Sequence, residues 1–241
     1  MRILVALLAL FMILPARAEV YIENMTWPEV SAAIKAGDDI AIIYAGSTEQ
    51  NGPHMVLGKH NLMAHRLAGM IAEKLGNALV YPVLPFAPTG DPAKRSGHMR
   101  YPGSVSLRID VYGAVIEDVA LSAIAAGFKY VLIMGDHGEG QGMLAKVASE
   151  LDKGARPYGV RVFHVKAVYM KMPGGHAGRE DTSMLMAVDG KGVRADRSDE
   201  AGPSNGADSS PKGGSIKEGE KLIESRVNAA VKEIRSLTAG H

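Results

Sequence analysis

The chain has 241 residues, with 27 basic and 26 acidic side chains and no cysteine. This near-balance of charge gives no electrostatic footprint for nucleic acid or an anionic membrane, so we expect a small-molecule substrate instead. Without cysteine the chain has no disulfide, thiol nucleophile or thiolate ligand, so a metal site must use His, Asp and Glu.

The N-terminus has the features of a secretory signal. Arg2 precedes twelve apolar residues, 3–14, and an Ala-Arg-Ala cleavage site ends at Ala18. The apolar run is too short for an ordinary membrane-spanning helix. We predict cleavage after Ala18, no membrane contact afterwards and a periplasmic or secreted location, the alternative being an uncleaved helix. Residues 19–241 are predicted to form one domain, because no linker-like segment divides them.

Alternating strand and helix patterns predict the fold class of the mature chain. Apolar, β-branched runs indicate buried strands at residues 39–44, 78–84, 130–134 and 161–168. Helical periodicity occurs at residues 61–74, 110–126, 140–151 and 215–234. Strands joined by helices pair in parallel with right-handed crossovers. We therefore predict a single-domain α/β fold of βαβ layers, with a mostly parallel central sheet flanked by helices.

Two polar clusters each follow a predicted strand. Residues 46–60 form a loop that contains Glu49, His54 and His60 among glycine and proline residues that favour turns. His137 and Glu139 follow the strand at residues 130–134. In open α/β sheets, ligands collect outside the carboxyl ends of the strands. We therefore expect both clusters to face one crevice and to form the active site.

Four stretches of the chain match, in order, the motifs of a known family. Residues 47–54 read Ser-Thr-Glu-Gln-Asn-Gly-Pro-His, and related patterns follow at residues 97–107, 134–139 and 175–183. Together they resemble the creatininase family, the creatinine amidohydrolase-like metal-dependent hydrolases. The resemblance implies the family fold and hydrolysis of a C–N bond in a small amide, cyclic amides included, by metal-activated water.

The resemblance also implies the metal ligands, with two departures. Glu49 and His137 occupy positions that bind one metal in the family, whereas its second-metal His corresponds to Asn51 and its bridging Asp to His60. An imidazole ordinarily gives one nitrogen to one metal, and Asn is a poor ligand for zinc-like ions. We therefore predict one divalent ion per subunit, zinc or else manganese or iron, bound by Glu49, His60 and His137. A surface location of His60 is the alternative.

Further roles follow from the same resemblance. Glu139 corresponds to a metal-ligating Glu and is either a fourth ligand or a general base. His176 stands where the family has a catalytic His, and we predict that it donates a proton to the leaving nitrogen, the alternative being a structural role. Residues expected to bind substrate or to support the ligands are His54, Asn51, His98, Asp136 and Asp181.

Three functional interpretations remain at this point. Creatinine is not the preferred substrate, because the single tryptophan, Trp27, lies far upstream and the chain lacks the Trp-lined lid expected in creatinine hydrolases. The presence of Glu139 and His176 favours an enzyme over a non-catalytic exported protein that binds metal or small molecules. A lactone or peptide hydrolase is the third interpretation. The resemblance also implies a homo-oligomer.

Overall fold

A four-stranded parallel sheet forms the centre of the molecule, in a computed structural model that describes residues 19–169 and 175–239. The predicted signal segment, residues 1–18, lies outside the described residues. The strands, in spatial order, are β2 Ala78–Val80, β1 Ile40–Ala45, β3 Tyr130–Gly135 and β4 Arg161–His164. The α-helices are α1 Trp27–Ala36, α2 Lys59–Leu75, α3 Ile109–Ala126, α4 Gln141–Ala155, α5 Arg179–Asp189 and α6 Ile216–Thr238. In this described part, no helix has the length and apolar character needed to cross a membrane.

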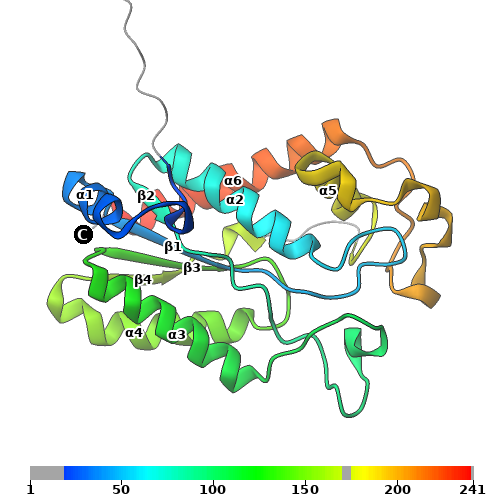
Figure 1. Cartoon of the computed structure of the whole chain (residues 1–241), viewed down its shortest axis with the longest axis horizontal. Helices are drawn as coiled ribbons and strands as arrows, with labels where there is room; N and C mark the ends of the chain where they lie inside the picture. Colours follow the sequence, from blue (N-terminus) through cyan, green and yellow to red (C-terminus); the bar gives the residue numbers. More distant parts are fainter. Residues whose placement is uncertain (1–18, 170–174, 240–241) are drawn as a thin grey trace, which may run out of the picture.

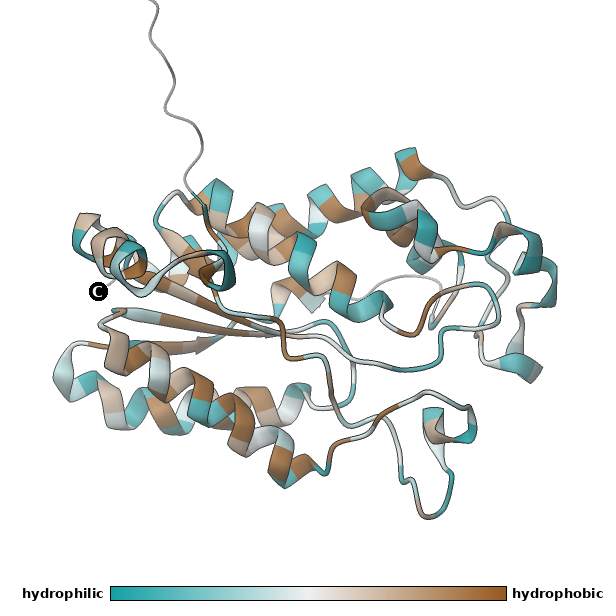
Figure 2. Cartoon of the chain, in the orientation of Figure 1, coloured by the Kyte–Doolittle hydropathy of each residue, from teal (hydrophilic) through white to brown (hydrophobic). Residues whose placement is uncertain are grey.

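Helices cover both faces of the sheet (Figure 1). Helices α2, α5 and α6 lie on one face, and α3 and α4 lie on the other. Side chains of a strand alternate between the two faces, so Ile42 and Tyr44 of β1 enter one apolar core and Ile43 enters the other. Figure 2 shows the apolar residues concentrated in the strands and on the helices that pack against them. The predicted fold class is confirmed.

Two predicted strands end earlier than expected. Strand β2 ends at Val80, because Pro82 has no N–H to donate to a sheet, although Leu84 still forms an isolated parallel bridge with Ala45. Strand β4 ends at His164 and is followed by a 3₁₀ turn, Ala167–Tyr169. The apolar character of residues 165–168 therefore reflects burial in the core and not a longer strand.

The two polar clusters lie at the same edge of the sheet. The loop after β1 leaves Ala45, and Asp136 follows β3, whose last residue pairs with Ala45. Helix α2 begins at Lys59, two residues earlier than predicted, so Lys59 and His60 belong to its first turn. A Cβ atom at Gly46 would lie 2.2 Å from Oδ1 of Asn61, which explains the glycine where this loop starts. The candidate site is therefore positioned by the carboxyl ends of β1 and β3 and by the first turn of α2.

Candidate active site

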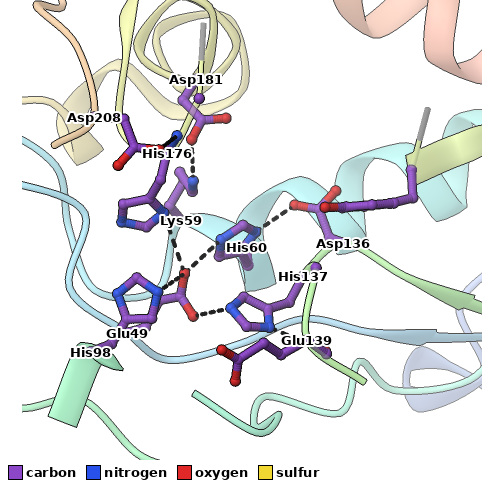
Figure 3. A pocket seen from close by; sticks show the side chains of 13 residues that line it. Glu49, Lys59, His60, His98, Asp136, His137, Glu139, His176, Asp181 and Asp208 are labelled. Atoms are coloured by element: carbon purple, nitrogen blue, oxygen red, sulfur yellow. Dashed lines mark hydrogen bonds and ion pairs between the residues drawn. The ribbon is translucent and has the colours of Figure 1, made fainter. Parts of the chain in front are cut away.

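A pocket of about 790 Å³ opens beyond the carboxyl ends of β1 and β3. Its walls are formed by Glu49, Lys59, His60, His98, Asp136, His137, Gly138, Glu139, Tyr169, Gly175, His176, Asp181 and Asp208. Figure 3 shows side chains from both predicted clusters pointing toward one another across this pocket. The convergence expected from the sequence is therefore observed.

The carboxylate of Glu49 is the centre of the cluster. Its Oε1 lies 3.0 Å from Nε2 of His60, and its Oε2 lies 2.7 Å from Nε2 of His137. Two further rings face Oε1, with Nδ1 of His176 at 3.7 Å and Nε2 of His98 at 3.8 Å. Four imidazoles thus surround one fully buried carboxylate (Figure 3).

Glu49 is ionised despite its burial. Removal from water favours the neutral acid, but the neighbouring His60 and His137 outweigh that effect and hold the pKa of Glu49 well below its ordinary value. The hydroxyl of Ser47 also donates a hydrogen bond to Oε2, at 2.8 Å. The site therefore contains a permanent negative charge that faces several ring nitrogens.

In His60 and His137, the hydrogen bond of Nδ1, the outer nitrogen that faces away from Glu49, determines whether Nε2, which faces Glu49, carries a proton. Nδ1 of His60 lies 2.8 Å from a carboxylate oxygen of Asp136, and Nδ1 of His137 lies 3.2 Å from the carbonyl of Glu139. Both partners only accept hydrogen bonds, so each Nδ1 carries a proton. In the neutral rings, Nε2 then presents a lone pair to an oxygen of Glu49. This arrangement needs a cation, either a proton or a metal ion, between ring and carboxylate.

Gln50 determines which ring nitrogen carries the proton in His98 and in His176. Its Oε1 accepts from the N–H of Gly52 at 2.9 Å, so its Nε2 is the donor to Nδ1 of His98, also at 2.9 Å. The neutral ring of His98 therefore turns an N–H toward Glu49. Nε2 of His176 lies 2.9 Å from the backbone carbonyl of Gln50 and 3.1 Å from its amide nitrogen. Because the carbonyl only accepts and is the nearer atom, we assign the proton to Nε2, so that Nδ1 faces the pocket with a lone pair.

The net effect of burial and nearby charges is to raise the pKa of His60 and to lower the pKa values of His98 and His176. Burial and the adjacent Lys59 disfavour the charged form of His60, but Glu49 and Asp136 outweigh them and raise its pKa above the ordinary value. Burial lowers the pKa of His98. Burial, with Lys59, lowers the pKa of His176 to about 4, so this ring is neutral near pH 7.

A buried ion pair forms another wall of the pocket. Nζ of Lys59 lies 2.5 Å from Oδ2 of Asp181, and that oxygen also accepts from the N–H of Ala177 at 3.0 Å. Burial opposes ionisation of Asp181, but Lys59 and His60 lower its pKa. The pair joins the start of α2 to the start of α5, so it fixes the distance between two walls of the pocket.

The remaining predicted residues have separate positions. His54 is buried outside the pocket walls, where its Nε2 is 3.0 Å from Oγ1 of Thr182. Asn51 is also buried, and its amide nitrogen donates to the carbonyls of Glu49 and Val56 at 2.8 and 3.2 Å. Asn51 therefore shapes the loop. Glu139 is exposed and lines the pocket beside His137 (Figure 3).

The donor set fits a divalent metal ion. Within residues 19–169 and 175–239, the ligand atoms that lie within 4.8 Å of one another form two groups, Glu49 with His60 and His176, and Glu49 with His98 and His137. Both groups share Glu49. Imidazole nitrogen with carboxylate oxygen is a donor set typical of zinc sites in proteins. The predicted trio of Glu49, His60 and His137 is divided between the two groups, because His60 belongs to the first and His137 to the second, on different oxygens of Glu49.

Sequence reasoning missed three residues that support this site. Lys59 and Gln50 lie directly beside predicted site residues, but a lysine or glutamine in a polar loop is usually solvated. Arg226 had a clearer signal, because it lies among Ile223 and Val227 on the apolar side of the last helix. A charged residue on a core-facing stripe needs a buried partner.

The fold and this donor set define a class, α/β proteins with a candidate metal site at the carboxyl edge of a parallel sheet. The model of the creatininase family, described as creatinine amidohydrolase, matches residues 23–234. The chain therefore belongs to the creatininase family, which confirms the resemblance seen in its motifs.

Relatives and solved structures agree with this assignment. Creatinine amidohydrolase of Pseudomonas putida is 28% identical over 120 residues, which cover 50% of this chain and 45% of that protein. Mycofactocin precursor peptide peptidase of Mycolicibacterium smegmatis is 26% identical over 166 residues, covering 65% of this chain and 61% of that protein. The matches thus span about half of the length of these relatives.

The likeness in fold extends further along the chain. A creatininase mutant structure has a TM-score of 0.77 at 24% identity and covers 90% of this chain and 98% of its own. A mutant creatininase described as the Zn-Zn type has a TM-score of 0.76 at 23% identity, covering 91% of this chain and 98% of its own. At these identities the likeness establishes the fold.

Proposed function

We propose that this protein is an exported metal-dependent hydrolase that opens a C–N bond of a small amide, cyclic amides included. The observation that carries the proposal is the pair of rings, His60 and His137, whose protonated outer nitrogens leave lone pairs facing the carboxylate of Glu49. Such carboxylate or carbonyl partners on the outer nitrogen are typical of metal-ligating histidines.

We further propose that the cation is one zinc ion per chain, with manganese or iron as alternatives. Glu49, His60 and His137 would hold it, and His176 faces the same carboxylate. When bound, a divalent ion of this kind acidifies water toward neutral pH and polarises a carbonyl oxygen. Asn51 stands where the family has its second-metal His, and an amide is a poor ligand for zinc-like ions, which supports a single ion.

The polar groups of the pocket have complementary proton states. His176 is neutral and presents an unprotonated Nδ1, so it can accept a proton from the attacking water and return it to the leaving nitrogen. His98 presents an N–H, which suits a hydrogen bond to a substrate oxygen. Glu139, at the pocket mouth, is the alternative base. Several groups with matched roles favour an enzyme over a protein that only binds.

A peptide bond is the second candidate substrate. A smaller pocket of about 390 Å³ shares His98 and His176 with the main pocket and is also lined by Arg100 and Tyr101. A substrate that occupies both would extend on either side of the two rings, as a linear peptide does. The similarity to a mycofactocin precursor peptide peptidase favours testing this class.

Turnover of an amide panel tests the proposed activity. We expect the zinc-supplemented protein to release amine from a five- or six-membered cyclic amide or from a short peptide, and a chelator to abolish release. Glu139→Gln and His176→Gln should each lower kcat by about 10²–10⁴-fold if the residue transfers a proton in the slow step.

His65→Gln is the matched control, because His65 stacks on Tyr21 at the surface, away from the pocket. It should keep the full rate. If the metal-loaded protein binds amides and hydrolyses none of them, the non-catalytic interpretation replaces the enzyme.

Export is proposed from the sequence of residues 1–18. The charged Arg2, the apolar run and the cleavage site ending at Ala18 support it. Expression of the full chain in a bacterium with an outer membrane should give a periplasmic product that begins at Glu19. A cytoplasmic product that retains Met1 would contradict export and would leave the proposed chemistry untouched.

A further inference from the structure

A buried arginine from the last helix lies directly behind the site. Arg226, in the middle of α6, is 8% exposed and donates through Nη2 to Oδ1 of Asp136. Its Nε donates to the carbonyl of Val168 at 2.7 Å, which fixes the direction of the guanidinium group. The hydroxyl of Tyr44, in β1, donates to the same Asp136 oxygen at 3.4 Å. Three separate elements therefore meet at one carboxylate.

The other oxygen of Asp136 faces the site. Oδ2 accepts from Nδ1 of His60 at 2.8 Å (Figure 3). Both oxygens of Asp136 are thus occupied by protein donors, although the residue lines the pocket. Asp136 is therefore committed to orienting its neighbours, and Arg226 supplies the positive charge that keeps a buried carboxylate ionised beside His60.

We propose that Arg226 is a positioning residue that acts through Asp136 to hold the ring of His60 with Nδ1 protonated and Nε2 directed at Glu49. The proposal rests on the proposed function in taking His60 as a metal ligand. Rotation of Asp136 would free the ring to turn or to change its protonated nitrogen, and either change removes the lone pair from the pocket. Partners of this kind behind a ligating histidine typically affect metal affinity by about 10–100-fold.

The chain of contacts also explains a long-range dependence on the last helix. Arg226 and Asp136 are 90 positions apart in the sequence, yet together they fix a ring in the first turn of α2. The guanidinium group contributes no atom to the walls of the pocket. Its hydrogen bond to Asp136 connects it to His60 and so to the candidate metal site.

Two measurements on the purified full protein test this role. In the metal-free protein, the proton on Nδ1 of His60 should give a slowly exchanging low-field NMR signal, assigned by its loss in His60→Asn. Zinc affinity is measured separately, by competition with a chelator. Arg226→Gln and Asp136→Ala should shift or broaden the NMR signal and weaken zinc binding by about 10–100-fold, and Arg226→Lys should recover part of both.

Arg235→Gln is the matched control, because Arg235 lies on the same helix and donates to the carbonyl of Lys74 at the surface. It should leave the NMR signal and the zinc affinity unchanged. The proposal is wrong if Arg226→Gln has the same melting temperature as the control, keeps the NMR signal of His60 and binds zinc within twofold of the affinity of the native protein. If the native protein binds no zinc while the signal responds as expected, the positioning role stands and the metal proposal fails.

Discussion

At the scale of single residues, the site consists of buried charges that are each compensated. Glu49 faces His60 and His137, and Lys59 is paired with Asp181. An unpaired charge in the interior costs several kcal/mol, whereas a well-bonded pair is close to neutral for stability. Removing one member of a pair is therefore expected to be more damaging than removing both.

The ion pair of Lys59 and Asp181 in the pocket wall tests this expectation. Lys59→Met leaves the carboxylate of Asp181 buried without its cation and should lower the free energy of unfolding by about 3–5 kcal/mol. The double variant Lys59→Met with Asp181→Leu should recover at least half of that loss. Urea denaturation of the single and double variants measures both values.

An exposed pair provides the control. Lys212 and Asp199 lie 2.9 Å apart with side chains 70% and 81% exposed, so Lys212→Met should cost less than about 1 kcal/mol. Equal effects of Lys59→Met and Lys212→Met would show that the burial of the first pair has no energetic consequence. A double variant less stable than Lys59→Met alone would show that the loss does not come from the unpaired carboxylate of Asp181.

At the scale of elements, the close approach of α5 and α6 holds the arginine and the ion pair in place. A Cβ atom at Gly219, in α6, would lie 1.9 Å from the backbone oxygen of Ser183 in α5. Only glycine permits this contact between the helices. The distance between α5 and α6 thus depends on the absence of a side chain at one position.

Gly219→Ala should therefore separate α5 from α6. We expect a loss of about 1–3 kcal/mol in the free energy of unfolding, because overpacking outweighs the higher helix propensity of alanine. Gly154→Ala, in α4, is the control, because no atom lies within 4 Å of the added Cβ, and it should stabilise by up to about 1 kcal/mol. Thermal unfolding monitored by circular dichroism compares the two. A stabilising effect of Gly219→Ala would contradict the packing described here.

A second prediction at this scale concerns pH and the contact between α4 and β4. Asp152 accepts from Nε of Arg161 at 2.8 Å, from the N–H of Val162 at 3.0 Å and from Arg156 at 2.6 Å. Burial opposes ionisation, but these donors lower the pKa of Asp152 to about 2. A pKa lower in the folded state than in the unfolded state gives stability above the unfolded value that is lost as the pH falls.

Asp152→Asn should accordingly lower the free energy of unfolding by about 2 kcal/mol near neutral pH. The difference from the native protein should shrink between about pH 4 and pH 2, where the native carboxylate takes up its proton. Urea unfolding across this range measures the difference. A difference that stays constant down to about pH 2 would mean that the charge of Asp152 contributes nothing to folding.

At the scale of the whole molecule, periodicity and polar loops predicted the layers and the edge where the site lies. Strand-like runs and helix stop signals are local, so the parallel sheet, the helices on both faces and the meeting of Glu49 with His137 followed from the sequence. The contact between Arg226 and Asp136 was not predicted, because Arg226 lies in the middle of a helix and not at a strand end, where the rule for α/β sheets places site residues. The orientation of the His60 ring also depends on Asp136, which accepts a hydrogen bond from its Nδ1.

The proposed function depends on the binding of a metal ion by Glu49 and the rings that surround it. The most direct test is the metal content of the purified protein by elemental analysis, for the native chain, Glu49→Gln and the surface control His65→Gln. We predict about one divalent ion per chain in the native protein and in His65→Gln, and none in Glu49→Gln with its fold retained. Equal metal content in all three proteins, or none in the native protein after supplementation, would contradict this prediction.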